Sequence, residues 1–168
     1  MCVRLTDFSR VTSIIAMIVG LISDTHGLVR PEAVAALSGC DHLIHAGDIG
    51  SADVLARLRE VAPLAVVRGN VDISPWARAI PETEAVELGG HYFYVLHNLA
   101  ELDIDPAAAG FSVVVSGHSH QPAVEHRDGV MYINPGSAGP RRFKLPVAVA
   151  RIHIGADALK AEPIILDV

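Results

Sequence analysis

Short apolar segments that end on polar, metal-competent residues are the feature that most constrains this chain. Aliphatic runs of this kind, alternating with Ala-rich stretches and polar turns, are typical of α/β proteins. Five of them are followed directly by Asp, His or Asn: Asp24 and His26 after IVGLIS, Asp48 after LIHAG, Asn70 after LAVVRG, His97 after YFYVL, and His118 and His120 after FSVVVSG. Because ligands of open α/β sheets bind outside the carboxyl ends of the strands, the pattern predicts a site built from strand ends.

The spacing and the chemistry of these residues favour a metal site. Asp24 and His26 are two residues apart, as are His118 and His120, so in an extended chain each pair points to one side. A glycine directly precedes three of the candidates, in the pairs Gly47-Asp48, Gly69-Asn70 and Gly117-His118. Glycine allows a sharp turn of the chain and a close approach of the backbone to a ligand. Histidine, carboxylate and amide without thiolate favour Mn, Fe, Co, Ni or Zn. Taken singly, each residue could be a turn former, a helix cap or a core histidine, so the hypothesis depends on their joint occurrence.

The same pattern predicts two packed sheets with helices outside. We expect hairpin turns at Gly89-Gly90 and Asp128-Gly129. The expected helices are Pro31–Leu37, Ala52–Glu60 and part of Asp103–Ala109. The expected strands are Ile18–Ser23, Leu43–Ala46, Leu64–Arg68, Ala85–Leu88, Tyr92–Leu96, Ser112–Ser116, Ala123–His126, Val130–Ile133, Val147–Ile154 and Lys160–Leu166.

Composition excludes several classes of protein. A chain of 168 residues that is 51% hydrophobic and 19% charged has the size and composition of one folded domain rather than of a disordered chain. Its net charge of -6 predicts no extended nucleic-acid surface. The two cysteines, Cys2 and Cys40, form no CxxC motif, which argues against a disulfide scaffold or a Cys-rich zinc site and indicates a reducing cytoplasm.

The N-terminal segment TSIIAMIVGLIS, residues 12–23, resembles a short signal peptide with Arg4 and Arg10 upstream. It is too short to span a membrane, and no A-x-A-like cleavage site follows it. Cleavage there would also remove the strand that carries Asp24. We therefore expect a cytoplasmic protein without a membrane partner, with residues 1–16 as an N-terminal extension ahead of a plausible start at Met17 and residues 17–168 as a single domain.

Taken in order, the candidate residues resemble the calcineurin-like metallophosphoesterase superfamily. The motifs are Asp24-x-His26, Gly47-Asp48, Gly69-Asn70, His97 and Gly117-His118-x-His120. The surrounding segments Ser23–Gly27, His45–Asp48, Gly69–Asp72 and Tyr132–Ser137 resemble its compact, YfcE-type phosphodiesterase branch. The resemblance covers nearly the whole chain and implies an α/β fold, a four-layer αββα sandwich of two mixed β-sheets flanked by helices.

The resemblance also implies a dinuclear metal site. One ion would take Asp24, His26, Asp48 and His120, and the other Asp48, Asn70, His97 and His118, with Asp48 bridging the two. Manganese is the first candidate, with Ni, Fe, Co or Zn as alternatives. Asp48, Asn70 and His97 would be catalytic, and a bridging water, acidified toward hydroxide, would attack the phosphorus of a phosphodiester.

Three departures from the family pattern qualify this interpretation. Val71 follows Asn70 where many members have a His that protonates the leaving group, so we expect activated aryl diesters to be preferred over alkyl monoesters. Asn98 follows His97 where a Gly is common, which puts the local turn in question. The segment Ile73–Glu84, with Trp76 and Arg78, does not align and is a candidate wall of the substrate pocket.

Other polar residues leave alternatives open. His45 fits either a support for the metal ligands or a plain buried histidine. The segment Asn134–Ser137 is either a loop beside the site or only a tight turn. Arg141 and Arg142 either meet substrate phosphate or are solvated, and we interpret His42, His91, His126 and His153 as non-ligands.

The expected partner is a small phosphodiester or nucleotide-like substrate, and the chain is compatible with a homo-oligomer. The alternative function is a weakly active or inactive protein-binding scaffold of the same fold, like the scaffold subunit of retromer. Complete occupancy of the ligand positions favours the enzyme. Neither the physiological substrate nor the native metal can be inferred from these residues.

Overall fold

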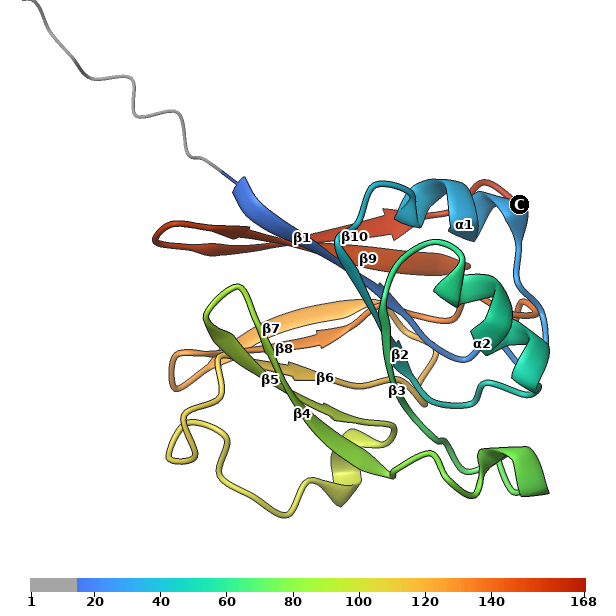
Figure 1. The fold of residues 1–168 in the computed structure, drawn as a ribbon, viewed down its shortest axis with the longest axis horizontal. Helices are drawn as coiled ribbons and strands as arrows, with labels where there is room; N and C mark the ends of the chain where they lie inside the picture. Colours follow the sequence, from blue (N-terminus) through green and yellow to red (C-terminus); the bar gives the residue numbers. More distant parts are fainter. Residues whose placement is uncertain (1–14) are drawn as a thin grey trace, which may run out of the picture.

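The computed structural model describes residues 15–168, and two five-stranded mixed β-sheets form its centre (Figure 1). The first sheet has the strand order β10-β9-β1-β2-β3. Its strands are β1 (Ile15–Ile22), β2 (His42–Ala46), β3 (Leu64–Val67), β9 (Ala148–Gly155) and β10 (Leu159–Ile165). Since β1, β2 and β3 are parallel, their carboxyl ends meet at one edge, while β9 runs antiparallel to β1 and β10.

The second sheet has the order β4-β5-β6-β8-β7. Its strands are β4 (Thr83–Leu88), β5 (His91–Leu96), β6 (Val113–Val115), β7 (Ala123–Arg127) and β8 (Val130–Asn134). The three central strands β5, β6 and β8 are parallel, and β4 and β7 join the edges through antiparallel hairpins. Both hairpin turns are confirmed: Gly89-Gly90 and Asp128-Gly129 link paired residues and have positive φ at both positions.

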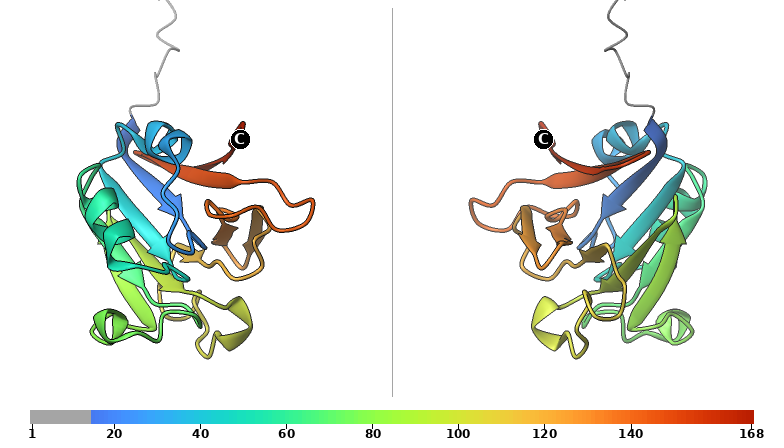
Figure 2. Two further views of the ribbon diagram at one scale, coloured as in Figure 1. Left: turned by 90° about the vertical axis from the view of Figure 1, so that its right-hand side faces the viewer. Right: turned by 90° about the vertical axis from the view of Figure 1, so that its left-hand side faces the viewer.

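The four expected layers are present. Adjacent residues of a strand point to opposite faces, so the fully buried Leu21 packs between the two sheets while Ile22 packs under the helices. The helices α1 (Pro31–Leu37) and α2 (Ala52–Arg59) cover the outer face of the first sheet (Figure 2). The outer face of the second sheet is covered by a thinner layer, formed by the short 3-10 helix η2 (Leu99–Glu101) and the chain that follows it.

One expected helix is wrong. In the segment Asp103–Ala109, the Ala109 N–H donates to the Asp105 carbonyl, but no helix is built on this single turn. Pro106 disfavours helical backbone at the residue before it, and Gly110 follows with φ +84°, so only one turn fits between them. A second 3-10 helix, η1 (Pro75–Ala77), lies in the segment that could not be aligned.

The first strand begins earlier than expected. Its first two residues are Ile15 and Ala16, and residues 1–14 of the expected extension lie outside the described part of the chain. Among residues 15–168, no helix has the length and apolar character needed to cross a membrane.

Candidate metal centre

Unusual backbone conformations mark the loops at the strand ends. Seven residues other than glycine have positive φ within residues 15–168, and five of them are predicted metal ligands. These five are Asp24 (53°), His26 (46°), Asp48 (56°), His118 (68°) and His120 (59°). Such conformations cost about 1–3 kcal/mol each and cluster at functional sites, where the surrounding structure over-determines them.

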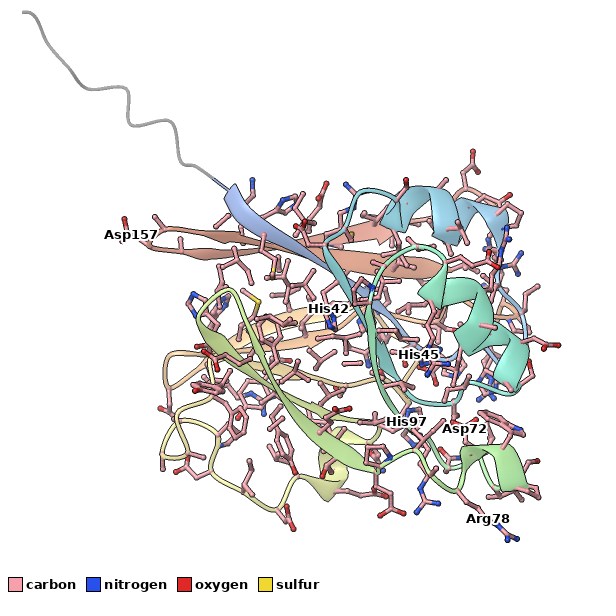
Figure 3. The ribbon with its side chains drawn as sticks, viewed as in Figure 1. His42, His45, Asp72, Arg78, His97 and Asp157 are labelled. Atoms are coloured by element: carbon pink, nitrogen blue, oxygen red, sulfur yellow. The ribbon has the colours of Figure 1, made fainter. Side chains whose placement is uncertain are left out.

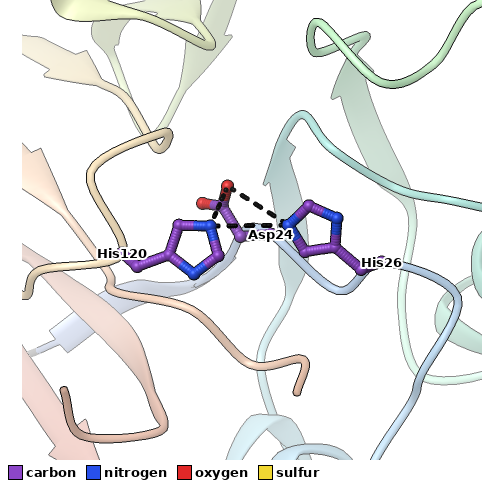
Figure 4. A group of neighbouring side chains, drawn as sticks. All are labelled: Asp24, His26 and His120. Carbon is purple, nitrogen blue, oxygen red and sulfur yellow. Dashed lines mark hydrogen bonds and ion pairs between the residues drawn. The ribbon is translucent and has the colours of Figure 1, made fainter. Parts of the chain in front are cut away.

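Asp24, His26 and His120 form the first group of converging ligand atoms (Figure 4). The Nε2 atom of His120 lies 3.2 Å from Oδ1 of Asp24, and Nε2 of His26 lies 4.0 Å from the same oxygen. The two Nε2 atoms are 3.4 Å apart. Three potential donor atoms from loops 94 residues apart in sequence therefore face one small volume, as a metal ion requires.

Asp24, Asp48 and His97 form the second group, adjacent to the first. Oδ1 of Asp48 lies 3.3 Å from Nε2 of His97, and Oδ2 of Asp48 lies 3.8 Å from Nε2 of His26. One carboxylate thus presents one oxygen to each group. Asp24 belongs to both groups, and Asp48 lies close to both.

Three buried side-chain atoms of the predicted ligands have no hydrogen-bond partner. One is Nδ1 of His120, and the other two face the ligand groups, where a cation is the natural occupant. Oδ1 of Asp24 and Nε2 of His97 are both inaccessible to solvent and unpaired, although buried polar atoms are normally satisfied. The Nδ1–H of His97 donates to the Ala46 carbonyl at 2.7 Å, so the lone pair of Nε2 faces the site. Carboxylate oxygens and imidazole nitrogens fit divalent transition metals.

The charges of the site are strongly coupled. Burial raises the pKa of Asp24, even though Ser23 donates a hydrogen bond to it. Burial also acts to raise the pKa of Asp48, but the contact with His97 and the N–H of Val71 outweigh it and lower that pKa overall. For His97, burial is outweighed by Asp48, and the pKa is raised. Protons therefore compete with cations for this site, and metal affinity is expected to fall at acid pH.

Asn70 and His118 are the two predicted ligands that are not part of these groups of Asp and His side chains. Both are exposed, and both line a cavity of about 630 Å³ together with His97. The His118 ring stands edge-on to the His97 ring, with centroids 5.2 Å apart. The structure thus places five of the seven predicted ligands in two groups of converging atoms that share Asp24, and the other two line a cavity together with His97.

Asp72 is a supporting residue that the sequence interpretation missed. Its buried carboxylate accepts hydrogen bonds from the N–H groups of Ile49, Gly50 and Gly69 at 2.8–3.0 Å. It therefore ties the loop that carries Asp48 to the loop that carries Asn70. The only signal in the sequence is its place in the Gly69–Asp72 motif, which does not reveal these partners.

Glycines keep the ligand loops close together. A Cβ atom on Gly69 would overlap the carboxylate of Asp48, and one on Gly117 would overlap the hydroxyl of Ser23. The Asp24 carboxylate uses this proximity, since its Oδ2 accepts hydrogen bonds from the Ser23 hydroxyl at 2.6 Å and the His118 N–H at 3.1 Å. Oδ2 is thereby fixed, and Oδ1 remains directed at the ligand groups.

Comparison with known proteins identifies the family. The family model described as the calcineurin-like phosphoesterase superfamily domain matches residues 17–157. The chain belongs to this superfamily. A probable metallophosphoesterase of Methanothermobacter thermautotrophicus is 32% identical over 158 residues, with 87% of this chain and 91% of the relative covered. The phosphodiesterase YfcE of Escherichia coli K12 is 31% identical over 145 residues, with 68% and 76% covered.

The fold itself is shared with a wider set of solved structures. Vps29 of Chaetomium thermophilum superposes with a TM-score of 0.72 at 16% identity, covering 90% of this chain and 97% of that one. At this identity the similarity concerns the fold alone.

The departures from the calcineurin-like pattern have simple structural outcomes. Asn98 has φ −107°, so its backbone needs no glycine, and its side chain caps η2 by accepting from the Ala100 N–H. Ile73 lines the 630 Å³ cavity with Asn70, as expected for a pocket wall. Trp76 instead packs toward α2, and Arg78 points into solvent (Figure 3).

The structure also shows how the segment Asn134–Ser137 and the two arginines that follow it are placed. Asn134 donates to the Gly117 carbonyl at 2.7 Å, and Ser137 donates to the Asp24 carbonyl at 3.0 Å, so the 134–137 loop supports the site. Arg141 is exposed and donates to the Val168 carbonyl. Arg142 lies near enough to His120 that its charge adds to burial in lowering the pKa of that histidine.

His45 supports the ligand loops and is not a ligand (Figure 3). Its Nδ1 accepts the Gly47 N–H at 3.1 Å, so its Nε2–H donates to the Thr25 hydroxyl at 2.9 Å, which in turn donates to the Ile49 carbonyl. His42 and His91 contact the Leu43 carbonyl and the Ser112 hydroxyl, and His153 pairs with Glu162. All three contacts lie outside the two ligand groups.

The burial of His45 predicts a pH dependence of stability. Burial, aided by the charge of His97, lowers the pKa of His45 from 6.5 to about 3. Between these values the unfolded chain binds a proton that the folded protein does not, so stability falls as the pH drops from about 6.5 toward 3, by up to about 1.4 kcal/mol per pH unit. Denaturant unfolding with chelator present at several pH values in this range measures the slope.

The variant His45→Gln keeps a donor for Thr25 but does not titrate, so its stability should depend less steeply on pH than that of the wild type. His126→Gln, on the exposed strand β7, is the matched control and should keep the wild-type slope. Equal slopes in His45→Gln and the wild type would contradict this explanation.

Proposed function

We propose that this protein is a metal-dependent phosphodiesterase. The observation that carries the proposal is the convergence of two unpaired buried atoms, Oδ1 of Asp24 and Nε2 of His97, with the side chains of His26, Asp48 and His120. Membership of the calcineurin-like superfamily and relatives named metallophosphoesterase or phosphodiesterase support it.

Two divalent transition-metal ions fit this donor set, with Mn as the first candidate. Asp24, His26, Asp48 and His120 would hold one ion, and Asp48, Asn70, His97 and His118 the other. Bound ions of this kind supply Lewis acidity, which lowers the pKa of water and withdraws charge from phosphoryl oxygens. Two such ions and two aspartates leave a formal charge of about +2, which suits a phosphate ester on a protein of net charge -6.

The chain's own residues orient this chemistry. Asp48 faces both ligand groups, and its Oδ1 also accepts the Val71 N–H at 3.1 Å, which fixes the carboxylate. The Ala46 carbonyl holds the His97 ring in the tautomer whose Nε2 faces the site. No side-chain nucleophile is needed when water attacks the phosphorus directly.

The position after Asn70 predicts the substrate preference. Val71 is exposed and has no proton to give to a leaving group. A general acid contributes about 10²–10⁴-fold in rate, so esters with poor leaving groups should suffer most. We expect bis-p-nitrophenyl phosphate to be hydrolysed much faster than an alkyl monoester such as glycerol phosphate, and equal rates for the two would contradict this prediction.

The test of the proposal is hydrolysis of bis-p-nitrophenyl phosphate by chelator-stripped protein, with Mn, Ni, Co, Zn, Mg or Ca added back singly. Turnover restored by a transition metal supports the proposal. Absence of turnover with every metal overturns it. If calorimetry then still showed metal binding, the result would favour the alternative, a protein-binding scaffold of the same fold.

A further inference from the structure

Two cavities lie beside the candidate metal centre, and Asn98 and the predicted ligand His118 line both of them. The small cavity, about 170 Å³, lies over β6, β7 and β8. The large cavity, about 630 Å³, extends toward β4, β5 and the loop after β3. A phosphodiester carries two ester groups that diverge from one phosphorus atom, so two neighbouring cavities offer each group its own place.

The walls of the small cavity suit a flat ring. Leu99 and Tyr132 supply apolar surface, and Arg127 lies over the Tyr132 ring with its guanidinium carbon 4.8 Å from the centroid. The Glu125 carboxylate accepts the Nε–H of Arg127 at 3.1 Å and so holds the guanidinium plane in place. Guanidinium planes stack on aromatic rings, and a planar group held against apolar walls selects for a planar ligand.

The volume of the small cavity limits the size of that ring. A dry apolar cavity of about 150 Å³ accommodates benzene, and this cavity measures about 170 Å³. The cavity is therefore close in size to one that holds a single six-membered ring.

The large cavity differs in charge as well as in size. The carboxylates of Glu82, Glu101 and Asp103 line it, and Arg68 is paired with Glu82 at 2.7 Å. These acidic groups disfavour a second phosphate. The ester group that occupies the large cavity is therefore expected to be polar without negative charge.

We propose that the small cavity is the subsite for a single-ring aromatic ester group of the phosphodiester substrate. This inference rests on the proposed function and adds the chemical class of one of the two ester groups. Ala123 on β7 and Leu99 on η2 both line the cavity, so a change in the size of either side chain should change the ring that fits.

The test compares the binding of three phosphonates that cannot be hydrolysed, methylphosphonate, phenylphosphonate and 1-naphthylphosphonate, to the Mn-loaded protein by calorimetry. Burial of the ring should make phenylphosphonate bind about tenfold or more tightly than methylphosphonate. The naphthyl compound should gain nothing further over phenylphosphonate, because the cavity is close in size to a single ring.

Two variants locate the ring. Ala123→Phe fills the small cavity and should abolish the preference for phenyl over methyl. Leu99→Ala enlarges the cavity and should make the naphthyl compound bind more tightly than the phenyl compound, which keeps the test informative if the added Phe disturbs β7. Ala100→Phe is the matched control, because Ala100 is exposed on η2 and lines neither cavity; it should keep the wild-type preference.

Failure of the inference can be told apart from failure of the proposed function. Equal binding of methyl- and phenylphosphonate, or a phenyl preference that survives in Ala123→Phe, overturns the subsite even when bis-p-nitrophenyl phosphate is hydrolysed. Absence of hydrolysis by the wild type with every metal overturns the function itself, whichever phosphonate binds more tightly.

Discussion

Replacing Asp48 by Asn is expected to lower kcat/KM for bis-p-nitrophenyl phosphate by on the order of 10³ or more. Asp48 presents one carboxylate oxygen to each ligand group, so both proposed ions lose a charged ligand at once. A bound metal ion contributes several kcal/mol of charge stabilisation in the transition state, and each 1.36 kcal/mol is about tenfold in rate. Asparagine has nearly the same shape, so the change is one of charge rather than of packing.

Thermal unfolding with and without metal separates this effect from misfolding. A ligand at about 100 times its Kd stabilises a folded protein by about 2.7 kcal/mol. The wild type should gain such a shift on addition of Mn, and Asp48→Asn should lose most of it while remaining folded with chelator present. The matched control is Asp53→Asn, an exposed aspartate in the first turn of α2, which should keep both activity and shift. Full activity in Asp48→Asn would refute a site in which this residue serves both ions.

The part of the site that could be predicted from the sequence consists of residues that directly follow the carboxyl ends of strands. Parallel strands bring their carboxyl ends to one edge, so the order of apolar runs and polar residues was enough to predict that Asp24 and Asp48, after β1 and β2, lie together. His97 follows β5 of the other sheet, and the resemblance to the superfamily was needed to place it with them. Short apolar runs likewise predicted the strands, because a strand that is packed on both faces has no exposed polar positions, as in Val113–Val115.

The rest of the site depends on contacts between segments that are far apart in the sequence. The order of residues along the chain does not reveal such contacts. Nothing local distinguishes Asp72, with its three backbone donors, from an ordinary turn residue. The left-handed backbone at His118 and His120 could not be predicted from the residue type, since only a few per cent of residues other than glycine adopt it. Alanines predicted a helix in the segment Asp103–Ala109, but Pro106 and Gly110 leave room for a single turn.

These contacts make Asp72 a residue whose loss should strongly reduce stability without removing a proposed metal ligand. Asp72→Ala leaves the N–H groups of Ile49, Gly50 and Gly69 without their acceptor in a largely buried position. Each unsatisfied buried group costs about 1–3 kcal/mol, so the free energy of unfolding should fall by roughly 3 kcal/mol or more. Denaturant unfolding with chelator present measures this loss directly.

The same substitution should weaken metal binding, because Asp72 holds the loop of Asp48 against the loop of Asn70. Loss of a residue that orients metal ligands typically costs about 10–100-fold in affinity, and calorimetry on the folded variant at low temperature measures it. Asp72→Asn keeps one carbonyl acceptor and should fall between the wild type and Asp72→Ala in both measurements. Asp167→Ala, at an exposed position near the end of the chain, is the control for loss of an aspartate charge. If Asp72→Ala matched this control in stability, the three hydrogen bonds would not be what joins the two loops, and the positioning of Asp48 would have to come from Gly69 and the Val71 N–H alone.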